Sequence, residues 1–169
     1  MDYTPHDFGA AAWLEADAVG EPGHRTFRLL VASGEGTASL WLEKEELQAL
    51  GVAIDQLMAR LSGRVQWKYY GAASSPAEPV RSVVGSPTVE FKIGQLSLGY
   101  EGDTNTFVLL VHAVEADPEG PATFTCLATP TQMRTLVRRI ETVLSAGRPR
   151  CPLCGDPMGP EAHICVRAN

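Results

Sequence analysis

Residues 26–31 read Thr26-Phe27-Arg28-Leu29-Leu30-Val31, and this stretch returns 80 residues later as Thr106-Phe107-Val108-Leu109-Leu110-Val111. A turn bearing glycine follows each copy, and a short β-type run follows each turn. The halves share one order of strand-like segments: residues 9–19, 26–31 and 37–42, then residues 89–100, 106–111 and 123–128. A common order across the two halves indicates an internal repeat.

An amphipathic helix is expected after the third strand-like segment of each half. Apolar side chains recur there at helical spacing, which places them on one face: Leu47, Leu50, Ile54, Leu57, Met58 and Leu61, then Met133, Leu136, Val137, Ile140, Val143 and Leu144. The second helix begins with Thr129, Pro130 and, two residues on, Gln132, the pattern of a capping box. Gly51 lowers the intrinsic stability of the first helix by up to about 1 kcal/mol, so that helix depends on packing.

The turns between consecutive strands are short, and short turns favour antiparallel hairpins. We therefore predict an α+β fold in which two β-β-β-α pseudo-repeats form a mainly antiparallel sheet, either six-stranded or as two abutting three-stranded sheets, with two helices packed on it. A short zinc knuckle is expected at the C-terminus. The predicted boundaries are residues 1–70 for the first unit, 71–87 for a flexible linker, 88–147 for the second unit, which shares the core, and 148–169 for the tail.

The composition is that of an acidic globular protein. The chain has 169 residues, 44% of them hydrophobic, and a net charge of −6. That apolar fraction excludes a wholly disordered chain, and the acidity argues against a general nucleic-acid coat. The longest apolar run, near residues 106–114, is about half of a membrane span. The N-terminus has no signal-peptide pattern. We expect a cytoplasmic protein that does not contact a membrane.

The C-terminal tail carries the clearest chemical motif. Cys151 and Cys154 are two residues apart, and after eight further residues come His163 and Cys165. Three thiolates and one imidazole complete a tetrahedral site, so we predict a structural Zn²⁺ with no open position. Gly155 allows the positive φ that such a turn needs. The alternatives are a redox pair, which lacks a following helix, and a disulfide, which a cytoplasmic protein disfavours.

Basic side chains gather toward the end of the chain. Residues 134–169 carry a local charge of +3, whereas residues 1–133 carry −9. The arginines are Arg134, Arg138, Arg139, Arg148, Arg150 and Arg167. They offer an anion, partner or RNA contact. Docking on the acidic remainder of the same chain, or on a second copy, is the reading we favour, since charge runs are usually solvated or self-compensating.

No catalytic constellation emerges from the sequence. Glu21, His24 and Arg25 form the one non-metal cluster that combines an acid, a base and a cation. They are the candidate catalytic residues if the protein is an enzyme or ligand-binding protein with a cleft between the two repeats. A polar hairpin loop explains the same residues.

Four stretches are similar to a bacterial family, common in actinobacteria, that is defined as domain of unknown function 3090. They are residues 20–27, 41–47, 147–155 and 160–169. The resemblance spans nearly the whole chain and is most specific at the tail. It implies a cytoplasmic bacterial protein with no assigned activity.

Together these observations predict a cytoplasmic zinc-binding protein that acts as a non-enzymatic interaction or adaptor module with a protein partner. The alternatives are an enzyme or small-ligand-binding protein with a cleft between the repeats, and RNA binding through the second helix and the tail.

Overall fold

A computed structural model describes residues 4–62, 86–147, 151–156, 158 and 163–167. Most of the predicted linker (71–87) lies outside these residues. The elements of the described chain are β1 (His6–Ala10), β2 (Trp13–Val19), β3 (Thr26–Ser33), β4 (Gly36–Leu42), α1 (Lys44–Ser62), β5 (Val89–Glu101), β6 (Thr106–Ala113), β7 (Phe124–Ala128) and α2 (Pro130–Ser145). After β1, this order is β-β-β-α twice over, as predicted.

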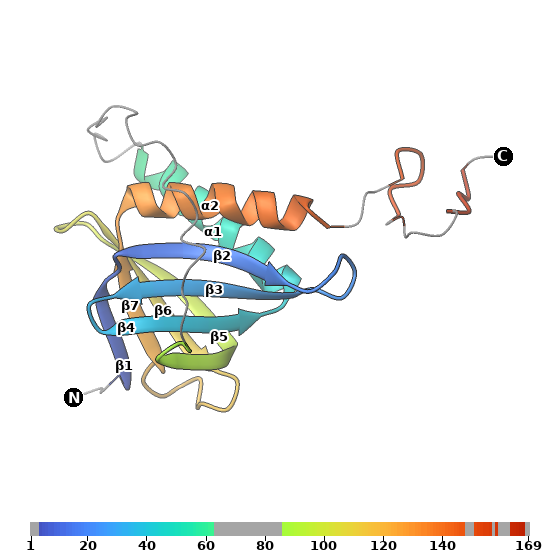
Figure 1. The fold of residues 1–169 in the computed structure, drawn as a ribbon. Helices are drawn as coiled ribbons and strands as arrows, with labels where there is room; N and C mark the ends of the chain where they lie inside the picture. The colour runs from blue at the N-terminus through green and yellow to red at the C-terminus, as the bar shows by residue number, and fades with distance from the viewer. Residues whose placement is uncertain (1–3, 63–85, 148–150, 157, 159–162, 168–169) are drawn as a thin grey trace.

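The strands form one seven-stranded sheet in the order β1-β7-β6-β5-β4-β3-β2 (Figure 1). Pairing is antiparallel within β2-β3-β4 and within β5-β6-β7. Two pairs are parallel, β4 with β5 and β1 with β7. The predicted α+β class with a mainly antiparallel sheet and two packed helices is confirmed.

The extra strand arises because residues 9–19, expected as a single strand, change partners midway. Residues up to Ala11 pair with β7, since the amide of Ala11 donates to the carbonyl of Leu127 at 2.8 Å. The next amide, that of Ala12, donates to the carbonyl of Ala32 in β3 at 2.7 Å. One continuous stretch of chain therefore bonds to both ends of the strand order, and the sheet curls on itself (Figure 1).

Strand β5 makes the corresponding change of partner in the other half. Its first residues, Val89–Lys92, pair with β4, and its later residues pair with β6. The change falls at Gly94, where the register shifts. A Cβ on Gly94 would lie 2.7 Å from the Cα of Val114, the residue that follows β6. The close approach of the two chain segments at this point therefore requires glycine. The β1–β2 segment and β5 are therefore equivalent in the two halves. Each begins by pairing with a strand of the other half and continues by pairing with the next strand of its own half.

The two halves also pair their strands in a matching register. Phe27 is paired with Leu42 in one half, and Phe107 with Ala128 in the other. Alternate residues along these strands are buried, as a sheet with one covered face requires. They join a single hydrophobic cluster with the helices, which includes Leu29, Val31, Leu40, Ile54, Leu109, Val111, Phe124, Met133, Leu136 and Ile140.

Both helices turn their predicted apolar faces to this core. Leu47, Leu50 and Ile54 of α1 are buried, while Leu57, Met58 and Leu61 of α1 and Leu144 of α2 are partly buried against the cluster. A Cβ on Gly51 would lie 3.3 Å from Cγ2 of Ile140, so the glycine permits a close contact between α1 and α2. No helix in the described part of the chain is both long and apolar enough to cross a membrane.

The start of α2 confirms the predicted capping box. The Thr129 side chain accepts a hydrogen bond from the amide of Gln132, and the Gln132 side chain accepts one from the amide of Thr129. Nε2 of Gln132 also donates to the carbonyl of Ala11 at 2.8 Å. The cap therefore ties α2 to the bend between β1 and β2.

Candidate metal centre

The tail folds locally around its first cysteine. The amide of Gly155 donates to the carbonyl of Cys151 at 2.9 Å, and the amide of Cys151 donates to the carbonyl of Asp156 at 2.8 Å. Gly155 adopts φ of 79°, in the left-handed region that favours glycine. This is the conformation predicted for it, and it closes the turn that brings Cys151 and Cys154 together.

The four predicted ligands come together in space. One Sγ or ring-nitrogen atom from each of Cys151, Cys154, His163 and Cys165 lies within 4.8 Å of the others. The Cys151 and Cys165 sulfurs are 3.7 Å apart, and Cys154 Sγ lies 3.2 Å from His163 Nε2. A tetrahedral ion with metal–sulfur bonds of about 2.3 Å would hold two sulfurs about 3.8 Å apart. The donor set and its spacing therefore fit a metal ion.

These sulfur distances do not fit a disulfide. A disulfide needs a sulfur–sulfur bond of about 2.05 Å, and all four cysteines of the chain are free. Cys126 lies apart from the cluster. It is fully buried in β7, and burial raises the pKa of its thiol to about 12. Cys126 is therefore a small core residue and not part of the cluster.

The cluster holds its thiols in unequal states. Hydrogen bonds from the backbone amides of Cys154 and Leu153 lower the pKa of the Cys151 thiol to about 6. The amide of Asp156 also favours a Cys154 thiolate, but burial and hydrogen bonds within the cluster outweigh it and raise the Cys154 pKa to about 11. Cys151 therefore forms a thiolate readily, whereas a Cys154 thiolate needs a cation to balance it. A bound metal ion supplies that balance.

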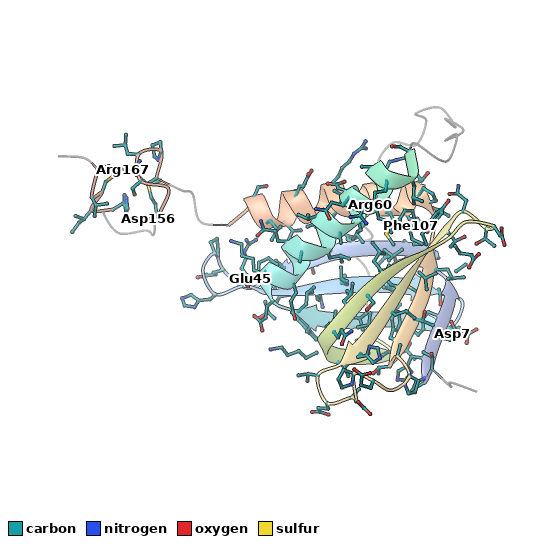
Figure 2. The ribbon with its side chains drawn as sticks, turned by 180° about the vertical axis from the view of Figure 1, so that it is seen from behind. Asp7, Glu45, Arg60, Phe107, Asp156 and Arg167 are labelled. Carbon is teal, nitrogen blue, oxygen red and sulfur yellow. The ribbon has the colours of Figure 1, made fainter. Side chains whose placement is uncertain are left out.

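Three exposed apolar side chains of the tail were not singled out from the sequence. Leu153, Ile164 and Val166 are 56%, 91% and 82% exposed. Ile164 and Val166 alternate with the ligands His163 and Cys165, which is a usable sequence signal, since alternate residues of an extended segment point to opposite sides. Figure 2 shows the tail, with Asp156 and Arg167 labelled, apart from the sheet and helices.

The predicted basic residues that the structure describes differ in their contacts. Arg139 lies against the body: its Nε is 3.0 Å from a Glu15 carboxylate oxygen and donates to the carbonyl of Ala16 at 3.1 Å. Arg134 and Arg138 are exposed on α2, and Arg167 is exposed in the tail. Arg148 and Arg150 lie outside the described residues. Arg139 therefore contacts its own chain, which is the interpretation that we favour for the basic residues.

The cluster of Glu21, His24 and Arg25 forms a turn with a structural contact. The His24 amide donates to the Glu21 carbonyl at 2.9 Å. Arg25 points away from this turn, and its Nη1 donates to the carbonyl of Val143 in α2 at 2.9 Å. Glu21 and His24 are exposed. These contacts are those of a hairpin loop that anchors one end of a helix.

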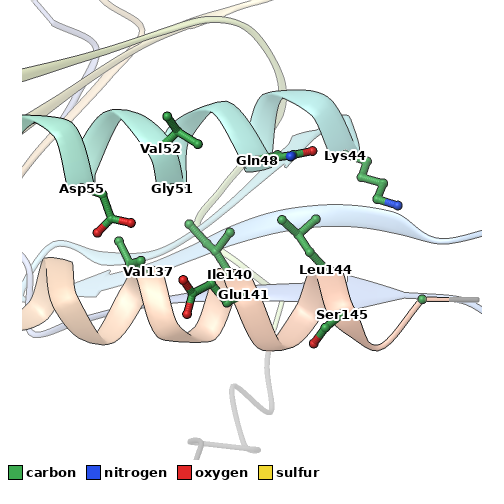
Figure 3. A pocket seen from close by; sticks show the side chains of 11 residues that line it. Lys44, Gln48, Gly51, Val52, Asp55, Val137, Ile140, Glu141, Leu144 and Ser145 are labelled. Atoms are coloured by element: carbon green, nitrogen blue, oxygen red, sulfur yellow. The ribbon is translucent and has the colours of Figure 1, made fainter. Parts of the chain in front are cut away.

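The structure does contain a groove between the two repeats, formed by their helices. Its volume is about 530 Å³, and it is lined from both α1 and α2 (Figure 3). A second cavity of about 250 Å³ lies between α1 and β5. Glu21, His24 and Arg25 line neither cavity.

The fold and the site define an α+β protein with a C-terminal group of three cysteines and one histidine that could hold a metal ion. The family model described as protein of unknown function (DUF3090) matches residues 6–165. The chain belongs to this family. The match extends through the last cysteine of the cluster. Comparison with curated proteins and with solved structures gave no match.

Proposed function

We propose that the tail binds one Zn²⁺ through Cys151, Cys154, His163 and Cys165. The observation that carries this proposal is the spacing of the four donor atoms, all within 4.8 Å of one another. Thiolates and imidazole are the ligands that Zn²⁺ prefers in tetrahedral sites. Soft thiolate ligands also bind other metal ions, so the assignment to zinc rests on the combination of sulfur and nitrogen ligands.

The zinc in this proposal is structural. Four side chains fill a tetrahedron and leave no position for water or substrate. The tail has no strand or helix among its described residues, and the one buried hydrophobic side chain among them is Cys151. A segment with so small a core folds only when an additional constraint is supplied, and a metal supplies one.

The tail then serves as a non-enzymatic interaction module in a cytoplasmic protein. Once folded around the metal it presents Leu153, Ile164 and Val166 to solvent. Large apolar side chains held exposed on a small module are typical of surfaces that bind protein. Free thiols at the cluster agree with the reducing cytoplasm. A protein surface, not a small molecule or RNA, is the contact that these side chains favour.

The test is the metal content of the purified full-length chain. We expect about one zinc per chain, lost when Cys151 or Cys154 is replaced by serine. Cys126→Ser is the matched control, because Cys126 is a cysteine in the core and not in the cluster. Metal-free protein with an ordered tail, or zinc that is lost equally in Cys126→Ser, would refute the assignment.

A further inference from the structure

The groove between α1 and α2 lies above the contact between the two helices. Gly51, Val137 and Ile140 are buried in that contact, and Leu144 is partly buried. Val52 lies at the margin of the groove and is 49% exposed, which leaves a large aliphatic side chain in water. Figure 3 shows Val137, Ile140 and Leu144 of α2 directed toward α1. Val52 and the partly buried Leu144 therefore leave apolar surface at the groove that no described residue covers.

The rim of this groove carries two acidic side chains. Asp55 of α1 and Glu141 of α2 line it, and neither carboxylate has an ion-pair partner among the described residues. Lys44 lines the near end together with Gly147, the last described residue before the tail. The tail thus leaves the body at one end of a groove with acidic edges.

The surface of the tail is complementary to this groove. Ile164 and Val166 are the two most exposed large apolar side chains of the described chain. Their alternation with His163 and Cys165 turns Ile164 away from the ligand side of the segment. Arg167 is exposed immediately after them. Apolar side chains followed by a cation match the exposed surface of Val52 and Leu144, which is bordered by carboxylates.

We propose that the zinc-loaded tail, which lies apart from the sheet and helices in Figure 2, packs back against the groove between α1 and α2 of its own chain. Ile164 and Val166 pack against Val52 and Leu144, and Arg167 faces the carboxylates of Asp55 and Glu141. This inference rests on the proposed zinc site, because the metal fixes which side chains of the tail face outward. It names the protein surface that the interaction module binds, namely the body of the same protein.

The chain is long enough for this arrangement. Gly147 lies at the near end of the groove, and Val137 lies ten residues earlier on α2, about 15 Å away along the helix axis. The four residues from Gly147 to Cys151 can span about 13 Å when extended. The metal cluster can therefore be placed over the middle of the groove without any movement of α2.

The experiment is ¹⁵N relaxation on the zinc-loaded, full-length chain. We expect residues 163–167 to share the rotational correlation time of the body in the unmodified protein. This shared value should be lost in Ile164→Ser, which changes the tail, and in Val52→Asp, which places a carboxylate in the groove. Val114→Asp is the matched control, since Val114 is 58% exposed and lines neither cavity.

A carbodiimide cross-link gives a second readout. Lys44 lines the groove, and Asp156 is an exposed carboxylate of the tail. We expect a Lys44–Asp156 cross-link within single chains, and its loss in Ile164→Ser and Val52→Asp.

Independent tumbling of the tail with zinc fully bound would overturn the docking and leave the zinc site standing. A cross-link that forms only between isotopically distinct chains would assign the groove to a second copy and likewise overturn it. Loss of zinc from the unmodified protein would instead refute the proposed function. Metal content is measured on every sample to separate these cases.

Discussion

Arg25, in the loop after β2, donates a hydrogen bond from Nη1 to the carbonyl oxygen of Val143 in the last turn of α2, at 2.9 Å. The guanidinium also stacks over the ring of Phe27, 5.1 Å from its centroid. The loop belongs to the first repeat and α2 to the second. A cation at the C-terminal end of a helix satisfies a free carbonyl and opposes the helix dipole. This contact therefore holds the two repeats together just before the tail begins.

Replacing Arg25 with alanine should lower the free energy of unfolding by about 1 to 2 kcal/mol, the cost of a charge-assisted hydrogen bond at a helix end. Chemical denaturation of the zinc-loaded protein measures it. His24→Ala is the control, because His24 is exposed and should change stability by less than about 0.5 kcal/mol. Equal effects of the two substitutions would show that the Val143 contact contributes nothing.

The cap of α2 gives a second prediction. Thr129→Ala removes one capping hydrogen bond and should cost about 1 kcal/mol. Gln132→Ala removes the reciprocal bond and also the bonds from Nε2 to the carbonyls of Ala11 and Ala12. It should cost about 2 kcal/mol. Thr131→Ala, at an exposed position of the same turn, is the control. If Gln132→Ala lowers the free energy of unfolding by no more than Thr129→Ala does, the hydrogen bonds of Gln132 to the β1–β2 bend are not stabilising.

Cys126 gives a pH-dependent prediction. Its thiol pKa rises from the ordinary value of 9.0 to about 12 because the side chain is buried. The folded state therefore disfavours the thiolate, and this contribution to stability is complete below pH 9 and is lost as the pH rises toward 12. Between about pH 9 and pH 11 the free energy of unfolding should fall by on the order of 2 kcal/mol more than in Cys126→Ala. Parallel pH profiles for the two proteins would contradict this.

The sequence predicts most of the elements because their signals are local. The spacing of Leu47, Leu50 and Ile54 and the Thr129–Gln132 cap both lie within single segments of chain. The repeated stretches at residues 26–31 and 106–111 place equivalent strands in equivalent positions. The Cys151–Cys154 and His163–Cys165 spacings are also local, and the structure brings those four side chains together as expected.

Features that depend on distant pairings were not predictable in the same way. The split of residues 9–19 into β1 and β2 results from the bonds of Ala11 to Leu127 and Ala12 to Ala32. Nothing in the local pattern of residues 9–19 specifies these partners. The hydrogen bond from Arg25 to Val143 joins residues that are 118 positions apart in the sequence. It gives a structural contact to a side chain that we had considered as a catalytic candidate. The groove needs two helices from different repeats to come together.

Removal of the metal should expose a defined order of cysteine reactivity. Without the metal the tail loses the constraint that folds it, and Cys151 and Cys154 become accessible, whereas Cys126 stays buried in β7 with a thiol pKa of about 12. Since the thiolate is the nucleophile, chelator-treated protein should be alkylated by iodoacetamide at Cys151 and Cys154 well before Cys126. Peptide mass spectrometry follows the three sites. Fast alkylation of Cys151 in the zinc-loaded protein would show that it is not a ligand.

Extended X-ray absorption fine structure at the zinc edge of the full-length protein tests the central claim most directly, because it reports the identity and distance of the zinc ligands. We predict a four-coordinate zinc with three sulfur ligands at about 2.3 Å and one imidazole nitrogen at about 2.0–2.1 Å, and no oxygen ligand. Cys126→Ser should leave the spectrum unchanged, and Cys165→Ser should remove one sulfur. A spectrum with two or fewer sulfur ligands in the unmodified protein, or with a bound water, would contradict the closed structural site.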